Sequence, residues 1–232
     1  IMFGSCFEEL LARCDELIVS TSGRILPLFE RSFTNRAKFV DRWEHLPEDL
    51  YDVQSPMLSA LGFLRQDQSD FEMAAKPYLV ADEKKMEILS GALEEHSGGN
   101  PIVGLSWFSQ NKTYGKRRSL RLEQIAERIP EDYFLVNLQY GDVNDEISQV
   151  AKKLGRNIAN FGNVDNWMHL DSLAALIMVC DKVVSIDNST AHFAGALGKE
   201  SHVLLPYSAD WRWGTSEDTS SYWYSATKLY WQ

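Results

Sequence analysis

The stretch VVSIDNSTAHFAGALG, residues 183–198, decides the fold. Its first four residues form a short apolar run typical of a buried strand. Asp187 follows, and a segment rich in small residues then runs to Gly198, as a helix does that lies close against a sheet and ends at a glycine. A strand that leads directly into a helix is the unit of a parallel α/β sheet, whose ligands bind beyond the carboxyl ends of the strands. The stretch therefore predicts an α/β fold with a ligand site at Asp187.

The residues after Asp187 suit an anion. Asn188, Ser189 and Thr190 would offer hydroxyls and backbone N–H groups at a helix N-terminus, where the helix dipole attracts negative charge. His192 lies about one turn into the helix and could face the same crevice. By residue type alone, a second interpretation is equally good: Asp187 and Ser189 cap the helix, and His192 is a buried histidine with its hydrogen bonds satisfied.

The rest of the chain alternates helix-like and strand-like segments, which predicts two α/β domains. The segment HSGGNP, residues 96–101, is the best linker, so we place the domains at residues 1–97 and 98–232. The first domain starts in a helix and looks incomplete. In it we expect strands at 17–19, 38–40 and 50–53, a loop over 66–75, and a helix capped by Asp82 over 82–95.

A basic loop follows the first predicted strand of the second domain, residues 102–107. Residues 109–120 place four cations within seven positions, namely Lys112, Lys116, Arg117 and Arg118, although the net charge of the chain is -10. At the end of a strand, such a loop can neutralise a diphosphate through charge-assisted hydrogen bonds. The alternative is a solvated, mobile loop.

The Asp187 segment resembles the pyrophosphate-binding motif of the heptosyltransferases, glycosyltransferase family nine, and of related bacterial transferases fused to tetratricopeptide repeats. Asp187 and His192 match that motif in type and spacing, whereas Asn188 and Ser189 stand where Thr and a Gly or Ala are usual. The resemblance covers residues 102–232 and extends more weakly to residues 77–79. It implies two Rossmann-like domains of the GT-B type, the N-terminal one incomplete.

The resemblance also implies which residues hold the donor. Ser106 and Gln139 close the first two strands of the second domain in the family manner, and a basic residue before the next helix, Arg117 or Arg118, contacts phosphate. Asp171 could cap its helix or contact the sugar, and we favour the cap. We expect the tryptophans of residues 206–213 to pack rather than take part in the chemistry. The expected donor and diphosphate site comprises Ser106, Lys112, Lys116, Arg117, Arg118, Gln139, Asp187, Asn188, Ser189, Thr190 and His192.

The implied reaction is transfer of a hexosyl or heptosyl group from a nucleoside diphosphate to a hydroxyl of a glycan, lipid-linked glycan or protein, without metal or cofactor. The opening residues, 1–4, resemble those that follow the family's glycine-rich loop, so the acidic base is expected before Ile1 and this fragment is expected to bind only. Two alternatives stay open: a nucleotide-sugar epimerase, and a degenerate domain that acts as an interaction module.

Composition and the spacing of particular residues argue against several other classes of protein. The net charge of -10 argues against nucleic acid as a partner. No apolar run reaches 18 residues, so no transmembrane segment is expected. Cys6, Cys14 and Cys180 lack metal-binding spacing and suit a reducing compartment, so we expect a location in the cytoplasm or at the periphery of the inner membrane. No GxGxxG follows a strand, which argues against a dinucleotide-dependent oxidoreductase.

Overall fold

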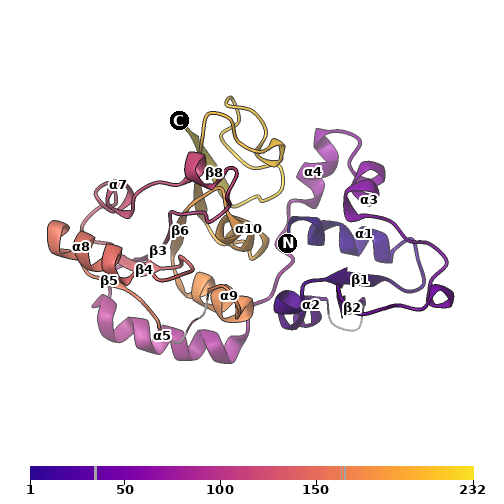
Figure 1. Cartoon of the computed structure of the whole chain (residues 1–232), viewed down its shortest axis with the longest axis horizontal. Coiled ribbons are helices and arrows are strands. Elements are labelled where there is room, and N and C mark those ends of the chain that lie inside the picture. Colours follow the sequence, from indigo (N-terminus) through magenta and orange to yellow (C-terminus); the bar gives the residue numbers. More distant parts are fainter. Residues whose placement is uncertain (34–35, 163, 165) are drawn as a thin grey trace.

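The computed structural model describes residues 1–33, 36–162, 164 and 166–232. It is a mixed α/β structure with two parallel sheets, a larger one built from the C-terminal half and a smaller one near the N-terminus (Figure 1). The large sheet, within the described residues, has six strands: β3 (Ile102–Ser106), β4 (Phe134–Asn137), β5 (Ile158–Ala159), β6 (Lys182–Ile186), β7 (Ser201–Leu205) and β8 (Thr227–Trp231). The predicted α/β class with Rossmann-like architecture is confirmed.

The order of strands in the large sheet is β5-β4-β3-β6-β7-β8, and every neighbouring pair is parallel. From β3 the chain moves outward to β4 and β5, then returns to place β6 on the other side of β3. This is the doubly wound order, and the reversal between β3 and β6 is its topological switch point. In doubly wound sheets the loops that leave the two strands of a switch point diverge, and ligands bind outside the carboxyl ends of these strands.

Helices cover the large sheet in two layers. On one face α5 (Glu83–Ser97), α9 (Leu170–Val179) and α10 (Ser189–Ala196) share a core with β6, β7 and β8. On the other face α7 (Leu122–Ala126) and α8 (Asn144–Leu154) pack on β3, β4 and β5 around a second core that includes Leu105 and Leu135. Alanines and Gly195 make α10 narrow, so it lies directly against the sheet, and every residue from Thr190 to Ala196 is buried.

The small sheet consists of β1 (Ile18–Thr21) and β2 (Lys38–Asp41), paired in parallel through α2 (Leu26–Ser32). Four phenylalanines, Phe7, Phe29, Phe33 and Phe39, pack together there with ring centroids 5.0–6.0 Å apart. Three further helices lie together above this sheet in the view of Figure 1, with α1 (Phe7–Leu11) next to β1 and, above it, α3 (Met57–Leu64) and α4 (Gln68–Ala74). The predicted strands at 17–19 and 38–40 are confirmed.

The chain passes from the small sheet to the large one through residues 77–80, which bind to the end of α10. The backbone amides of Tyr78 and Leu79 both donate to the carbonyl oxygen of Ala196, at 2.9 and 3.1 Å. Helix α5 then packs against α9, with the helices of the large sheet. The first of the two cores continues through both parts of the chain and contains buried residues from Met2 to Leu229.

Two predictions in the N-terminal part are wrong. Residues 50–53 do not form a strand: Glu48–Leu50 is a 3₁₀ turn, and Val53 is exposed because no neighbouring strand covers it. Residues 66–75 are not a loop but contain α4. The carboxylate of Asp67 accepts hydrogen bonds from the backbone amides of Ser69 and Asp70, and the carboxylate of Asp70 accepts one from the Asp67 amide. This capping box stabilises the first turn of a short helix.

Candidate functional site

The site begins where β3 and β6 end side by side, with Ser106 opposite Ser185 in the ladder. Asn188 caps α10 just beyond β6, and its side-chain oxygen accepts from the Thr190 amide at 2.9 Å and from the Ser185 hydroxyl at 3.0 Å. Its side-chain amide donates to the Ser106 hydroxyl at 2.8 Å. The same side chain thus starts the helix and ties the two strand ends of the switch point together.

Gln139 extends this network to the end of β4. Its side-chain oxygen accepts from the Ser106 hydroxyl at 3.1 Å and from the backbone amides of Trp107 and Phe108 at 3.0 and 2.8 Å. Gln139 and Ser106 are both buried. Because the Gln139 oxygen already serves three donors, the residue fixes the direction in which the chain leaves β3.

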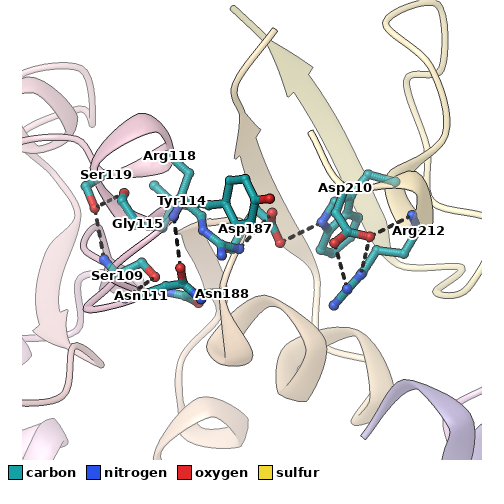
Figure 2. A network of polar contacts seen from close by, with 12 residues as sticks. Ser109, Asn111, Tyr114, Gly115, Arg118, Ser119, Asp187, Asn188, Asp210 and Arg212 are labelled. Carbon is teal, nitrogen blue, oxygen red and sulfur yellow. Dashed lines mark hydrogen bonds and ion pairs between the residues drawn. The ribbon is translucent and has the colours of Figure 1, made fainter. Parts of the chain in front are cut away.

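The basic loop after β3 is compact. The side chain of Asn111 accepts from the amides of Thr113 and Tyr114, and the Ser119 hydroxyl joins Ser109 to Gly115 (Figure 2). A Cβ on Gly115 would lie 2.3 Å from the carbonyl oxygen of Ser109, so only glycine fits at this point of closest approach. The loop ends in the short helix α6 (Gly115–Arg118), which delivers Arg118 toward Asp187.

Arg118 and Asp187 form the charged centre of the site. One guanidinium nitrogen of Arg118 donates to the Asp187 carboxylate at 3.0 Å and to the Asp187 carbonyl at 2.9 Å. The other carboxylate oxygen accepts from the indole N–H of Trp213 at 2.8 Å. Figure 2 shows Arg118 reaching Asp187 from the basic loop, while the turn that carries Arg212 lies on the opposite side. The carboxylate is 95% buried, and these two donors compensate its desolvation.

His192 lies beside this centre, on the buried side of α10. Its ring stacks on the Trp213 ring with centroids 4.9 Å apart, and its Nδ1 lies 3.0 Å from the Tyr224 hydroxyl. Burial, with a smaller contribution from the positive charge of Arg212, lowers the pKa of His192 to about 3. The imidazole is therefore neutral at physiological pH.

The remaining predicted residues lie further out. Lys112, Lys116 and Arg117 are exposed, and none of them forms an ion pair with another described residue. Lys116 lines a groove of about 440 Å³ between the basic loop and α7. Thr190 is buried within α10, whereas Ser189 is exposed at its N-terminus. The sequence did not decide between Arg117 and Arg118, and of these two it is Arg118 that contacts Asp187.

The prediction that Asp171 caps α9 is wrong, because its side chain makes no cap hydrogen bond there. Asp171 instead binds Arg31 of α2 and Lys85 of α5. Burial alone would raise the pKa of this carboxyl, but the hydrogen bonds from the two cations outweigh burial and lower it. Asp171 is therefore an ionic link between the two parts of the chain.

Sequence reasoning missed two residues of the site. Trp213 was expected only to pack, yet it donates to Asp187, and Tyr224 was not singled out. Both come from the irregular segment between β7 and β8. The available signal was the density of tryptophan and tyrosine in a loop that leaves the carboxyl end of a strand, since buried Trp and Tyr need partners for their polar atoms.

Two solved structures share this architecture. ADP-heptose LPS heptosyltransferase II of E. coli superposes with a TM-score of 0.59 at 14% identity, over 99% of this chain and 86% of the other. The glycosyl transferase family 9 structure from Veillonella parvula DSM 2008 superposes with a TM-score of 0.52 at 14% identity, over 99% of this chain and 66% of that one. The chain has the fold of the family 9 glycosyltransferases. No family model matches the sequence.

In sequence, the chain is 27% identical over 237 residues to Protein FlbA of Caulobacter vibrioides. The match covers 93% of this chain but 39% of FlbA, so the chain spans about two fifths of that relative. In the part of the chain that the structure describes, no helix is long and apolar enough to cross a membrane. The same residues contain no group of three or more His, Cys, Asp or Glu side chains that could hold a metal ion.

Proposed function

We propose that the C-terminal part of this chain binds a nucleoside-diphosphate sugar at the switch point, and that the chain belongs to a protein that transfers the sugar to an acceptor hydroxyl. The observation that carries this proposal is the convergence of Arg118, Asp187 and the N-terminus of α10 at the carboxyl ends of β3 and β6. In doubly wound sheets this is where ligands bind.

The charges support a diphosphate as the ligand group. The helix α10 directs its N-terminal dipole at the crevice, and Ser189 is exposed at that end. Arg118 stands beside it with a planar guanidinium suited to phosphate oxygens. Lys112, Lys116 and Arg117 add positive charge on the same loop. Together these groups would stabilise the negative charge that develops on a departing diphosphate, without a metal ion.

The experiment is a thermal-shift titration with ADP, UDP and GDP. One nucleotide should raise the melting temperature in a concentration-dependent way, because a ligand that binds only the folded state stabilises it. Arg118→Ala and Asp187→Asn should weaken the effect, and Arg128→Ala is the matched control, because Arg128 is an exposed cation on the α7 side of the sheet. No shift with any of the three nucleotides would count against the proposal.

A further inference from the structure

One face of the large sheet is covered by helices over only part of its width. Helices α7 and α8 pack on β3, β4 and β5, where Val103 and Leu105 of β3 are buried. Paired residues of a parallel ladder lie on the same face, and Leu105 pairs with Val184 of β6. Val184 is only half-buried, and Tyr230, which lies on the same face of β8, is exposed. The helical cover therefore ends between β3 and β6.

The opposite face of the same strands, on the side of α10, is closed. Every second residue of β6, β7 and β8 belongs to that face and is buried: Val183, Ser185, Ser201, Val203, Leu205, Thr227 and Leu229. Strands of a parallel sheet are normally buried on both faces, because a layer of helices covers each of them. Within the described residues, β6, β7 and β8 thus have one helical layer where a parallel sheet normally has two.

A groove of about 540 Å³ lies on this uncovered face, between α7 and the strands β6, β7 and β8. Its lining is largely apolar. Val184 and Leu204 contribute from the strands, and Ile125 and Ile129 contribute from α7 and the turn after it. Tyr230 of β8 lines the groove as well. These side chains are exposed at the position that a further helix beside α7 would cover.

The charged side chains that line the groove are of one sign. Arg128 and Lys182 line it together with His202, and none of its described lining residues has an acidic side chain, although the chain has a net charge of -10. Glu200 lies just outside and compensates part of this charge, at 3.1 Å from Lys182 and 3.3 Å from His202. The Arg128 side chain is 75% exposed, and its ion pair with Glu127 spans 3.9 Å. Because such exposed pairs contribute little, Arg128 can bind a carboxylate from a partner.

We propose that this groove docks an amphipathic helix of a partner protein, which places apolar side chains on Val184 and Leu204 and an acidic side chain beside Arg128. The occupant is a helix because the groove lies on the face of the sheet, and α7 and α8 cover the rest of that face. Its flank is acidic because the rim of the groove is basic. The inference does not rest on the proposed function, since the groove is on a face of the sheet and the donor site is at the carboxyl ends of its strands.

Two synthetic peptides of about 18 residues, long enough to form an isolated helix, serve as probes. Both have leucine at every third or fourth position, and they differ only in whether glutamate or lysine flanks the leucines. Fluorescence anisotropy of the labelled peptides measures their binding to the unchanged protein. We expect saturable one-to-one binding of the glutamate peptide and at least tenfold weaker binding of the lysine peptide. No binding of the glutamate peptide, or equal binding of both, would overturn the proposal.

Arg128→Glu should weaken binding of the glutamate peptide about tenfold, because it reverses the charge at the rim of the groove. Arg121→Glu is the matched control. Arg121 precedes α7, its side chain is 72% exposed, its ion pair with Glu123 also spans 3.9 Å, and it is not among the described residues that line the groove. Leu204→Gln should weaken binding of both peptides, and its circular dichroism reports whether it is folded. Equal effects of Arg128→Glu and Arg121→Glu would contradict docking at this groove.

Two other occupants of the groove are outcomes of further measurements. Sedimentation velocity gives the oligomeric state, and a dimer of the unchanged protein that Arg128→Glu and Leu204→Gln both dissociate would assign the groove to a second copy and overturn the proposal. Sodium dodecanoate tests for an anionic lipid, and its saturable binding without binding of the glutamate peptide would also overturn it. A monomer that binds the glutamate peptide, with NMR shift changes of backbone amides in β6, β7 and β8, would confirm the docking of a partner helix.

Discussion

At the scale of single residues, Asp187 shows how the site is assembled from three segments. It directly follows β6, and its carboxylate accepts a hydrogen bond from Arg118 of the basic loop on one oxygen and from Trp213 of the β7–β8 connection on the other. Neither contact is local in sequence, with separations of 69 and 26 residues. A buried carboxylate between two donors is costly to disturb, because removal of one donor leaves part of its charge uncompensated.

Trp213→Phe should therefore lower the free energy of unfolding by about 1.5–3 kcal/mol, the range for a hydrogen bond to a charged group. Urea denaturation measures the change. Trp211→Phe serves as the control, because Trp211 belongs to the same 3₁₀ turn but is 56% exposed. Equal effects of the two substitutions would mean that the indole N–H contributes nothing to holding Asp187.

Part of this centre is predictable from sequence and part is not. The basic loop and the segment after β6 each follow a strand, and parallel strands end at the same edge of the sheet. The order of strands and loops in the sequence is therefore sufficient to predict that Arg118 and Asp187 lie near each other. Trp213 and Tyr224 come from a connection of 21 residues between Leu205 and Thr227 that holds only a 3₁₀ turn. Such a segment has no periodicity that tells where a side chain points.

At the scale of elements, α10 links the site to the connection between the two parts. Its N-terminus carries Asn188 and lies at the carboxyl end of β6, and its last carbonyl group, on Ala196, accepts hydrogen bonds from the amides of Tyr78 and Leu79. Gly195 lets Tyr224 pack against the helix between these two ends. The small residues that predicted a close helix–sheet contact thus also make room for an aromatic ring from a distant segment.

Gly195→Ala should destabilise the protein by about 1–3 kcal/mol, because the added methyl overlaps the Tyr224 ring. Gly91→Ala is the matched control: Gly91 lies inside α5 with nothing within 4 Å of the new Cβ. Gly91→Ala should raise the free energy of unfolding by about 0.5–1 kcal/mol, because alanine favours the helix more than glycine does. Thermal unfolding measures the stability of both variants. A Gly195→Ala variant as stable as the unchanged protein would contradict the close packing of Tyr224 on α10.

Helix α4 is an element that the sequence analysis does not predict. It has seven residues, too few for a clear apolar period, and its polar composition predicts a loop. The capping box of Asp67 and Asp70 was nevertheless visible as an acidic pair three residues apart. Long patterned elements such as α5 and β3 were recovered, because packing on the large sheet agrees with their local preference.

Asp67→Ala should therefore lower the free energy of unfolding by about 0.5–2 kcal/mol through loss of the N-cap. Chemical denaturation gives the value, with Gln68→Ala as a neighbouring substitution that leaves the cap intact. Hydrogen exchange of the Ser69 and Asp70 amides, which donate to Asp67, should accelerate in the first variant only. Unchanged exchange there would contradict the capping role.

At the scale of the whole molecule, an ionic link joins the part around the small sheet to the large one. Arg31 of α2 and Lys85 of α5 both bind Asp171 at the start of α9, and Arg31 also donates to the carbonyl of Val80 at 2.9 Å. The sequence predicted two folding units but gave no sign of this contact. Lys85 and Arg31 lie 86 and 140 residues from Asp171 in the sequence, and no local sequence pattern predicts ion pairs over such separations.

The pH dependence of stability tests this link. Because the pKa of Asp171 is lowered on folding, its ionised form stabilises the folded state above the unfolded value of about 3.9, and this contribution is lost as the pH falls through the lower folded value. Asp171→Asn should have a lower free energy of unfolding than the unchanged protein at pH 6, and the difference between the two should become smaller toward pH 3. A gap that is constant from pH 6 to pH 3 would contradict a charged contact.

Isothermal titration calorimetry can show whether the site at the switch point binds a nucleoside diphosphate. The nucleoside diphosphate chosen by thermal shift is titrated into the unchanged protein, Arg118→Ala and Arg128→Ala. We predict saturable one-to-one binding that weakens about tenfold or more in Arg118→Ala and is unchanged in Arg128→Ala. Binding that both variants retain equally, or no binding by the unchanged protein, would contradict a donor site at Arg118 and Asp187.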